Sequence, residues 1–393
     1  MPNALKRYRR AALALFALNG FLYSSWAARV PSIQTAYGID DATMGLVLIA
    51  ASGGAFLSMP FAAYIFERLG VGRVALLAAL LYILAVPAIP AFSEIPMLFV
   101  VYALMGVGFG LLDVAMNSQA VEVERLYGRS IISSFHAAFS ASMIVGALLS
   151  SLLIYFGLSL GTHLLLASVA ALGILAYAHP KMLPDALLVH ESVSGEKDGP
   201  AFRLPVRATW LIGAVGFCSM MSEASISDWT AKYMLEVAHS GPAISTWSLA
   251  AFSIAMTLGR LRGDGMRDRL GDARLLRWGA VLAFSGLGLS LLVPLPATTI
   301  IGAALVGTGL SVAVPIVFSL AGNLPGIAPS AALAMVTSIS YLGLFLGPAV
   351  IGFLADHFGL RAGYGFILGA LGLMLILVLR LGSTARAPQP APS

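Results

Sequence analysis

Hydrophobic residues along the chain fall into runs of about 20, separated by short segments that carry most of the charges. A helix rises about 1.5 Å per residue, so about 20 apolar residues cross a hydrocarbon core about 30 Å thick. Backbone polar groups in lipid must be satisfied within each segment, which predicts helices. Twelve spans are predicted, at residues 11–29, 44–66, 74–93, 97–120, 131–156, 160–178, 208–229, 244–262, 275–294, 297–321, 332–355 and 361–381.

The longest polar interruption, residues 179–207, contains proline, glycine and charged residues and divides the spans into six and six. We therefore predict an N-terminal six-helix bundle at 1–178, a cytoplasmic linker at 179–207 and a C-terminal six-helix bundle at 208–383. Residues 384–393 are expected to form a disordered cytoplasmic tail.

Composition supports a membrane protein, because 59% of the residues are hydrophobic and only 10% are charged. Every Lys and Arg falls on one side of the predicted topology except Arg29, Lys232 and Arg361. By the positive-inside rule, that side and both termini are cytoplasmic. Topology then explains the net charge of +5, and no nucleic-acid partner is expected. The basic start 6-KRYRR-10 is also typical of a signal peptide, but eleven further spans favour a first transmembrane helix.

The two predicted halves repeat each other in sequence. Residues 67–73 read ERLGVGR, and residues 268–274, found 201 positions later, read DRLGDAR. Residues 25–29 (SWAAR) and 228–232 (DWTAK), 203 positions apart, align Trp26 with Trp229 and the basic residue Arg29 with Lys232. Two matches at nearly the same offset indicate a duplicated architecture.

Six plus six helices, a long linker and an acid-Arg-x-Gly-x-x-Arg loop in each half resemble the major facilitator superfamily over residues 8–381. The first loop departs from the usual motif, with Ala63 in place of its opening glycine and Glu67 in place of aspartate. The resemblance implies an all-α membrane protein with two pseudo-symmetric six-helix bundles around a central cavity, which opens alternately to the two sides. We predict that the loop residues latch the cytoplasmic face closed, namely Glu67, Arg68, Gly70, Arg73, Asp268, Arg269, Gly271 and Arg274.

A narrower resemblance comes from the predicted fourth and fifth spans. The pattern Gly-x-Gly-x-x-Asp-x-Ala-x-Asn at 108–117, followed by Arg129 and 133-SSFH-136, is similar to the fucose permease branch and its bacterial relatives. In that branch, an acid at the position of Asp113 takes part in proton coupling, and a second acid in the first helix corresponds here to Ala27. The resemblance implies a location in the bacterial inner membrane.

Ionisable residues inside apolar spans are costly to bury and point to function. Asp113 and Glu223 are the two acids predicted deep in the membrane, and we assign both to proton coupling. His136 enters its span to a similar depth, and we predict a proton relay between it and Asp113. Asn117, one helical turn from Asp113, is predicted to bond this acid or a polar solute. In the alternative interpretation, Asp113 only ties its helix to its neighbours through His136.

Polar and aromatic residues of the first and seventh spans are further candidates. Arg29 and Asp228 lie at corresponding rims, and we predict an ion pair that closes the outer mouth; two solvated rim charges are the alternative. Trp26 and Trp229 are interpreted either as solute-binding residues or as members of the interfacial aromatic belt. Asn19 is expected to bind solute in the cavity or to face another helix, because its amide is costly in lipid.

Three glycines, Gly106, Gly108 and Gly110, superficially resemble a phosphate-binding loop. No Gly-Lys-Ser/Thr follows them, and they lie inside a predicted span. Close packing of helices is therefore predicted at these positions.

Together these features predict a secondary transporter that moves a small polar solute by alternating access, coupled to protons. A drug or metabolite efflux antiporter is one alternative, and a non-transporting membrane sensor on the same fold is another. No enzyme, cofactor or metal site is expected, because the chain has no His-Glu-x-x-His and no Gly-x-Ser-x-Gly. Basic residues are all expected at membrane edges, which argues against a strongly anionic solute. The expected partners are the solute, protons and the lipid bilayer, with the protein acting as a monomer.

Overall fold

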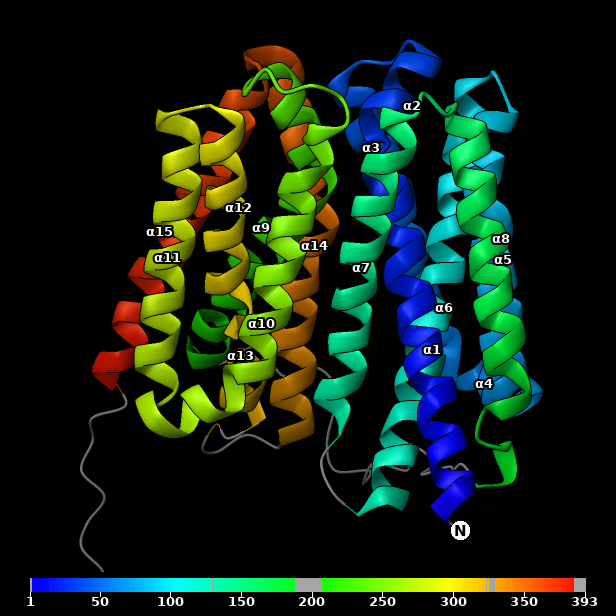
Figure 1. Ribbon diagram of the computed structural model, residues 1–393. Helices are drawn as coiled ribbons and strands as arrows, with labels where there is room; N and C mark the ends of the chain where they lie inside the picture. The colour runs from blue at the N-terminus through cyan, green and yellow to red at the C-terminus, as the bar shows by residue number, and fades with distance from the viewer. Residues whose placement is uncertain (1, 129–130, 188–206, 323, 325–328, 385–393) are drawn as a thin grey trace, which may run out of the picture.

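The computed structural model describes residues 2–128, 131–187, 207–322, 324 and 329–384. Helices are the only regular structure in these segments, and most stand side by side along one direction (Figure 1). The start of α1 and the end of α15 lie at the same end of the bundle, here called the terminus end; α2 lies at the far end. The α-helices are α1 (Pro2–Ala27), α2 (Val30–Tyr37), α3 (Asp41–Ser58), α4 (Ala62–Leu69), α5 (Val71–Ala88), α6 (Ile95–Tyr127), α7 (Ile132–Tyr155), α8 (Leu160–Ala178), α9 (Arg207–Glu236), α10 (Trp247–Leu270), α11 (Asp272–Leu292), α12 (Pro296–Leu310), α13 (Ala313–Gly322), α14 (Pro329–Phe358) and α15 (Leu360–Thr384).

The predicted spans correspond to these helices, with α3 and α4 forming one span and α12 and α13 another. Among the described residues, nine spans are long and apolar enough to cross a membrane, and α1 with α2 makes a tenth across a 48° bend. The two remaining predicted spans are α9 and α10, which carry acidic, basic and hydroxyl side chains along their length. The all-α membrane fold is confirmed, and its two most polar helices are the ones to examine for function.

The helices pack in two groups that meet along two seams. In the first group, α1 packs against α7 and α8, and α6 packs against α3 and α5. In the second, α9 packs against α14 and α15, and α12 packs against α10 and α11. The seams are α3 against α14 and α7 against α10. The bundle limits 1–178 and 208–383 stay predictions, and most of the linker and tail (188–206 and 385–393) lies outside the described residues.

The two repeated loops make the same turn in the two groups. Gly70 ends α4 with φ 81° and ψ 149°, and Gly271 ends α10 with φ 74° and ψ 155°. Glycine adopts such positive φ values without the steric cost that other residues have. The matched sequences therefore fold in the same way locally, which supports a duplication.

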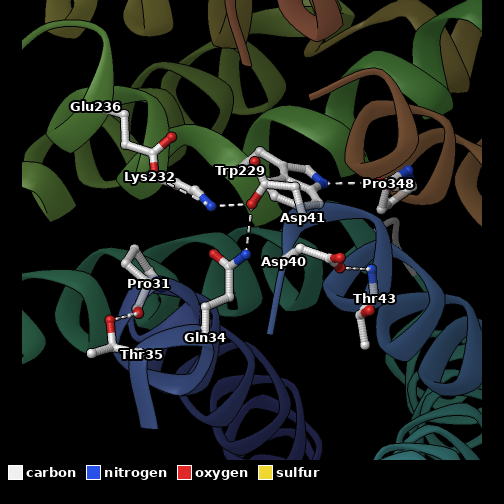
Figure 2. Close-up of polar contacts among 10 residues, drawn as sticks. All are labelled: Pro31, Gln34, Thr35, Asp40, Asp41, Thr43, Trp229, Lys232, Glu236 and Pro348. Carbon is white, nitrogen blue, oxygen red and sulfur yellow. Dashed lines mark hydrogen bonds and ion pairs between the residues drawn. The ribbon is translucent and has the colours of Figure 1, made fainter. Parts of the chain in front are cut away.

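Two adjacent acids at the start of α3 have separate roles. Asp40 caps the helix, because its carboxylate accepts a hydrogen bond from the backbone N–H of Thr43 at 2.7 Å. Hydrogen bonding from Thr43 lowers the pKa of Asp40. Asp41 takes no part in this cap and its side chain faces the second group of helices (Figure 2).

Glycines of α6 allow neighbouring helices to approach closely. A Cβ atom placed on Gly106 would lie 1.8 Å from the carbonyl oxygen of Ala51 in α3. One placed on Gly108 would lie 2.8 Å from the backbone nitrogen of Tyr82 in α5. These contacts confirm the predicted close packing.

Gly106→Ala is expected to destabilise the protein by about 1–3 kcal/mol, because α3 and α6 must move apart to admit the methyl group. Gly173→Ala in α8 is the matched control, since nothing lies within 4 Å of its Cβ position. There, alanine is expected to raise helix stability by about 0.5–1 kcal/mol. Thermal unfolding of both variants in detergent measures the difference. A Gly106→Ala melting temperature equal to that of the control would contradict the close contact.

Candidate functional site

A cavity of about 310 Å³, here called the central cavity, lies between the two groups of helices. Most of its wall is apolar, built from aromatic, methionine and aliphatic side chains of both groups. Its charged lining residues are Asp113, Glu223, Asp228 and Arg260. A largely apolar cavity with a few polar groups is the usual form of a small-molecule site.

An ion pair crosses part of the cavity wall. Nη2 of Arg260 in α10 lies 3.1 Å from Oε1 of Glu223 in α9. Nη1 of the same guanidinium donates to Oγ of Ser140 in α7 at 3.3 Å, so the pair is tied to the seam between the groups. Arg260 was expected at a membrane edge, near the end of a span predicted to stop at residue 262. The structure places its side chain in the wall of the central cavity, and α10 continues to Leu270.

Asp113 lines the central cavity from α6. Within the described part of the chain, no side chain forms a hydrogen bond or ion pair with its carboxyl group, although the hydroxyl of Tyr341 is close enough to interact electrostatically. Asn117 does not bond this carboxyl; its Nδ2 donates to the backbone oxygen of Asp113 at 2.8 Å. A negative charge on Asp113 is therefore uncompensated, which makes this group a candidate for proton binding.

His136 and Asp113 are not brought together. α7 and α6 both pack against α1, and they barely touch each other, so their sequence order does not make them neighbours. The exposed His136 ring makes an edge contact with Phe16, with ring centroids 5.2 Å apart. The structure therefore gives no support to a direct proton relay between the two side chains.

Asp228 is buried in the cavity wall rather than solvated at a rim. It is 6% exposed, and its Oδ1 accepts a hydrogen bond from the Tyr23 hydroxyl at 2.7 Å. The centroid of the Tyr23 ring lies 5.2 Å from that of Trp26 and 6.2 Å from that of Phe109. The ring centroids of Phe109 and Tyr82 are 5.9 Å apart. All four rings line the central cavity. Tyr23, Trp26, Tyr82, Phe109 and Asp228 are here called the aromatic box.

Neither candidate tryptophan belongs to a lipid-facing belt. Trp26 is 4% exposed, and its Nε1 donates to the Tyr82 hydroxyl at 3.2 Å. Trp229 is fully buried, and its Nε1 donates to the carbonyl of Pro348 at 3.0 Å, so it supports α14 without lining the cavity. Asn19 also lies outside the lining; it is buried against α6, with Nδ2 3.7 Å from Sδ of Met116.

Arg29 and Asp228 do not form the predicted ion pair here. α1 ends at Ala27 and the chain bends into α2, which directs the Arg29 side chain toward α8. Its Nε donates to Nδ1 of His163 at 2.8 Å, and its Nη2 donates to the Leu158 carbonyl at 2.8 Å. Both partners lie in the first half of the chain, His163 in α8 and Leu158 in the segment just before it.

A different ion pair joins the two groups at the far end, between Lys232 of α9 and Asp41 of α3 (Figure 2). The two side chains are 11% and 10% exposed. Lys232 also pairs with Glu236 at 3.2 Å, and Nε2 of Gln34 donates to Asp41 at 2.6 Å. These four residues are here called the far-end cluster. The sequence signal for it was slight: two opposite charges, 191 positions apart, at the outer ends of different halves.

The sequence matches the family model described as Major Facilitator Superfamily over residues 11–328. The chain belongs to the major facilitator superfamily. It is 33% identical over 373 residues to an uncharacterised MFS-type transporter of Yersinia pestis, covering 95% of this chain and 93% of that protein. It is 30% identical over 372 residues to an uncharacterised transporter of Sinorhizobium fredii, covering 94% and 96%. The solved structure of the nucleoside transporter NupG shares the fold, with a TM-score of 0.74 at 13% identity over 98% of this chain and 100% of that one.

Membership of the major facilitator superfamily makes this chain a multi-pass membrane protein and a secondary transporter, not an enzyme. The family does not specify the solute.

Among the described residues, the superfamily loop motifs make no hydrogen bond or ion pair between the halves. The Arg68 guanidinium lies over the ring of Tyr64, 4.4 Å from its centroid. The remaining charged motif residues whose side chains are described are all exposed, namely Glu67, Arg73, Arg269 and Arg274. The side chain of Asp268 lies outside the described residues. An ion pair thus joins the halves at the far end, whereas no ion pair joins the described residues of the motif loops at the terminus end.

Proposed function

We propose that this transporter moves a small polar solute across the bacterial inner membrane by alternating access, with Asp113 coupling the movement to protons. The observation that carries the proposal is the position of Asp113, whose carboxyl group lines a mostly apolar cavity between the halves without a basic partner. Inside a membrane protein, such a group marks an ion or proton pathway.

Alternating access is supported by the uneven contacts between the halves. The far-end cluster closes one end of the bundle, whereas the motif loops at the other end are exposed. With cytoplasmic termini, this arrangement corresponds to a state closed toward the outside. In the opposite state, the Asp41–Lys232 pair separates and the motif loops meet.

Proton coupling needs only that solute affinity differ between the protonated and ionised forms of Asp113, since linkage is reciprocal. Glu223 is the second candidate, although Arg260 already offsets its charge. Of the two acids assigned to proton coupling, Asp113 is therefore the one whose protonation most changes the charge of the cavity.

A thermal-shift screen of the purified protein followed by transport in proteoliposomes tests this function. The screen includes sugars, sugar acids, organic cations and nucleosides, the last because NupG is a nucleoside transporter. We expect the stabilising solute to accumulate when a proton gradient is imposed in the productive direction, and only to equilibrate when an uncoupler is present. Binding without any flux would favour the sensor, and equilibration under both directions of gradient would rule out proton coupling.

A further inference from the structure

The central cavity contains more acidic than basic groups. Its charged lining residues are three carboxyls and one guanidinium, and the guanidinium of Arg260 is paired with Glu223 at 3.1 Å. In the described part of the chain, no basic side chain lies within 4.0 Å of the carboxyl of Asp113 or Asp228. Two carboxyl groups thus lack a basic partner. A proton on Asp113, as in the proposed function, accounts for one of them.

Asp228 is surrounded differently from Asp113. It contacts Tyr23, whose ring belongs to the four of the aromatic box. These rings line the cavity and contact one another at centroid distances of 5.2–6.2 Å. Tyr23 donates to Oδ1, and no described group donates to Oδ2. Aromatic faces attract cations electrostatically, and grouped aromatic rings bind quaternary ammonium compounds. A carboxylate hydrogen-bonded to one of these rings adds a negative charge to the same part of the cavity wall.

We propose that the central cavity binds an organic cation, an amine or a quaternary ammonium compound, with its charged group in the aromatic box beside Asp228. The apolar remainder of the ligand lies along the methionine and aromatic side chains of the wall. A neutral polyol would leave Asp228 uncompensated, and an anion would meet it directly. The inference rests on the proposed function in one respect: it takes the bound cation to be the solute that the protein transports.

Choline and 3,3-dimethylbutan-1-ol are the probes, because they share one shape and differ only in the positive charge. Isothermal titration and thermal shift are measured on the purified full-length protein, without any gradient. Choline is expected to bind at least about tenfold more tightly than the alcohol and to raise the melting temperature. Equal binding of the two probes, or no binding of choline to the folded wild-type protein, would overturn the proposal.

Variants locate the cation within the cavity. Asp228→Asn is expected to weaken choline binding at least about tenfold, because it removes the charge and keeps the shape. Asp356→Asn, which removes an acid outside the cavity, is the charge control. Loss of choline binding in Asp113→Asn but not in Asp228→Asn would contradict the assigned position.

Phe109→Leu provides a second test if Asp228→Asn does not fold. It removes one ring of the box and keeps an apolar wall, so choline should bind a few-fold more weakly while the alcohol is unaffected. An unchanged affinity for choline would count against the box. These binding experiments use no gradient, so their failure leaves proton-driven transport standing. Conversely, choline binding without proton-driven uptake would contradict the proposed function and leave the cation site supported.

Discussion

Asp113→Asn is expected to lower proton-driven accumulation of the solute at least about tenfold, while binding and equilibrium exchange stay within about threefold of wild type. Asparagine has nearly the same size as the neutral acid but cannot release a proton. The substitution breaks no ion pair among the described residues, because the Asp113 carboxyl has none. Uptake and counterflow in proteoliposomes measure the two quantities separately.

Asp356→Asn is the matched control for Asp113→Asn, because it removes the same charge from α14 outside the cavity, and both activities should survive. If Asp113→Asn still concentrates the solute when only a proton gradient is supplied, Asp113 is not the coupling site. Glu223 is then the next acid to test. Substitution of Glu223 also leaves the guanidinium of Arg260 without its carboxylate partner. Glu223→Gln must therefore be compared with a double variant that removes both charges.

Lys232→Met is expected to open the far end of the bundle. In the closed state it leaves Asp41 buried without its basic partner, which costs about 3–5 kcal/mol, and opening restores water to the carboxylate. Spin labels at Thr35 in α2 and Ala297 in α12, both exposed, report the separation of the halves. We expect one short distance in the parent protein and a dominant longer distance in Lys232→Met.

Glu236→Gln is the control for this gate, since Glu236 contacts Lys232 within α9 and leaves the pair between the halves intact. Its distance distribution should match that of the parent. Adding Asp41→Asn to Lys232→Met removes the stranded charge, so the double variant should return partly to the short distance. If the longer distance appears in the Glu236→Gln control, or does not appear in Lys232→Met, the far-end cluster does not hold this end of the bundle closed.

Much of this fold follows from the sequence, because lipid imposes a simple rule on each span. Apolar runs of about 20 residues predict the positions of the helices, and the repeated ERLGVGR and DRLGDAR loops predict two matching turns, at Gly70 and Gly271. The ends of the helices are predicted less well. α10 runs to Leu270 because a helix continues past its apolar stretch into polar residues until a glycine ends it.

The site divides into residues that chemistry alone identifies and residues that require geometry. Asp113 and Glu223 were predicted because acids in apolar spans are rare, and both line the central cavity. Asp228 was predicted as one partner of an ion pair at the rim, and the structure places it in the cavity wall instead. The ion pair of Lys232 with Asp41 depends on how two helices from different halves meet, which no local pattern contains. The predicted pairing of Asp113 with His136 fails for the same reason, because neighbours in sequence are not always neighbours in space.

The aromatic box was missed for another reason. Tyr23 and Phe109 look like ordinary apolar positions in their helices, and only the cavity distinguishes them from core residues. Trp26 was named as a candidate from its position near the end of a span. Its role beside Tyr82 depends on the packing of α1 against α5.

Labelling one cavity residue from each side of the membrane tests alternating access most directly, and it requires no knowledge of the solute. Ser52→Cys places a thiol in the cavity wall, in a Cys218→Ser background that removes the native thiol. A membrane-impermeant thiol reagent is applied to vesicles of each orientation. We predict reciprocal rates: relative to the parent, Lys232→Met speeds labelling from the far end and slows it from the terminus end. Labelling that rises from both sides together, as in an open channel, or that occurs from one side only in both proteins, would contradict alternating access.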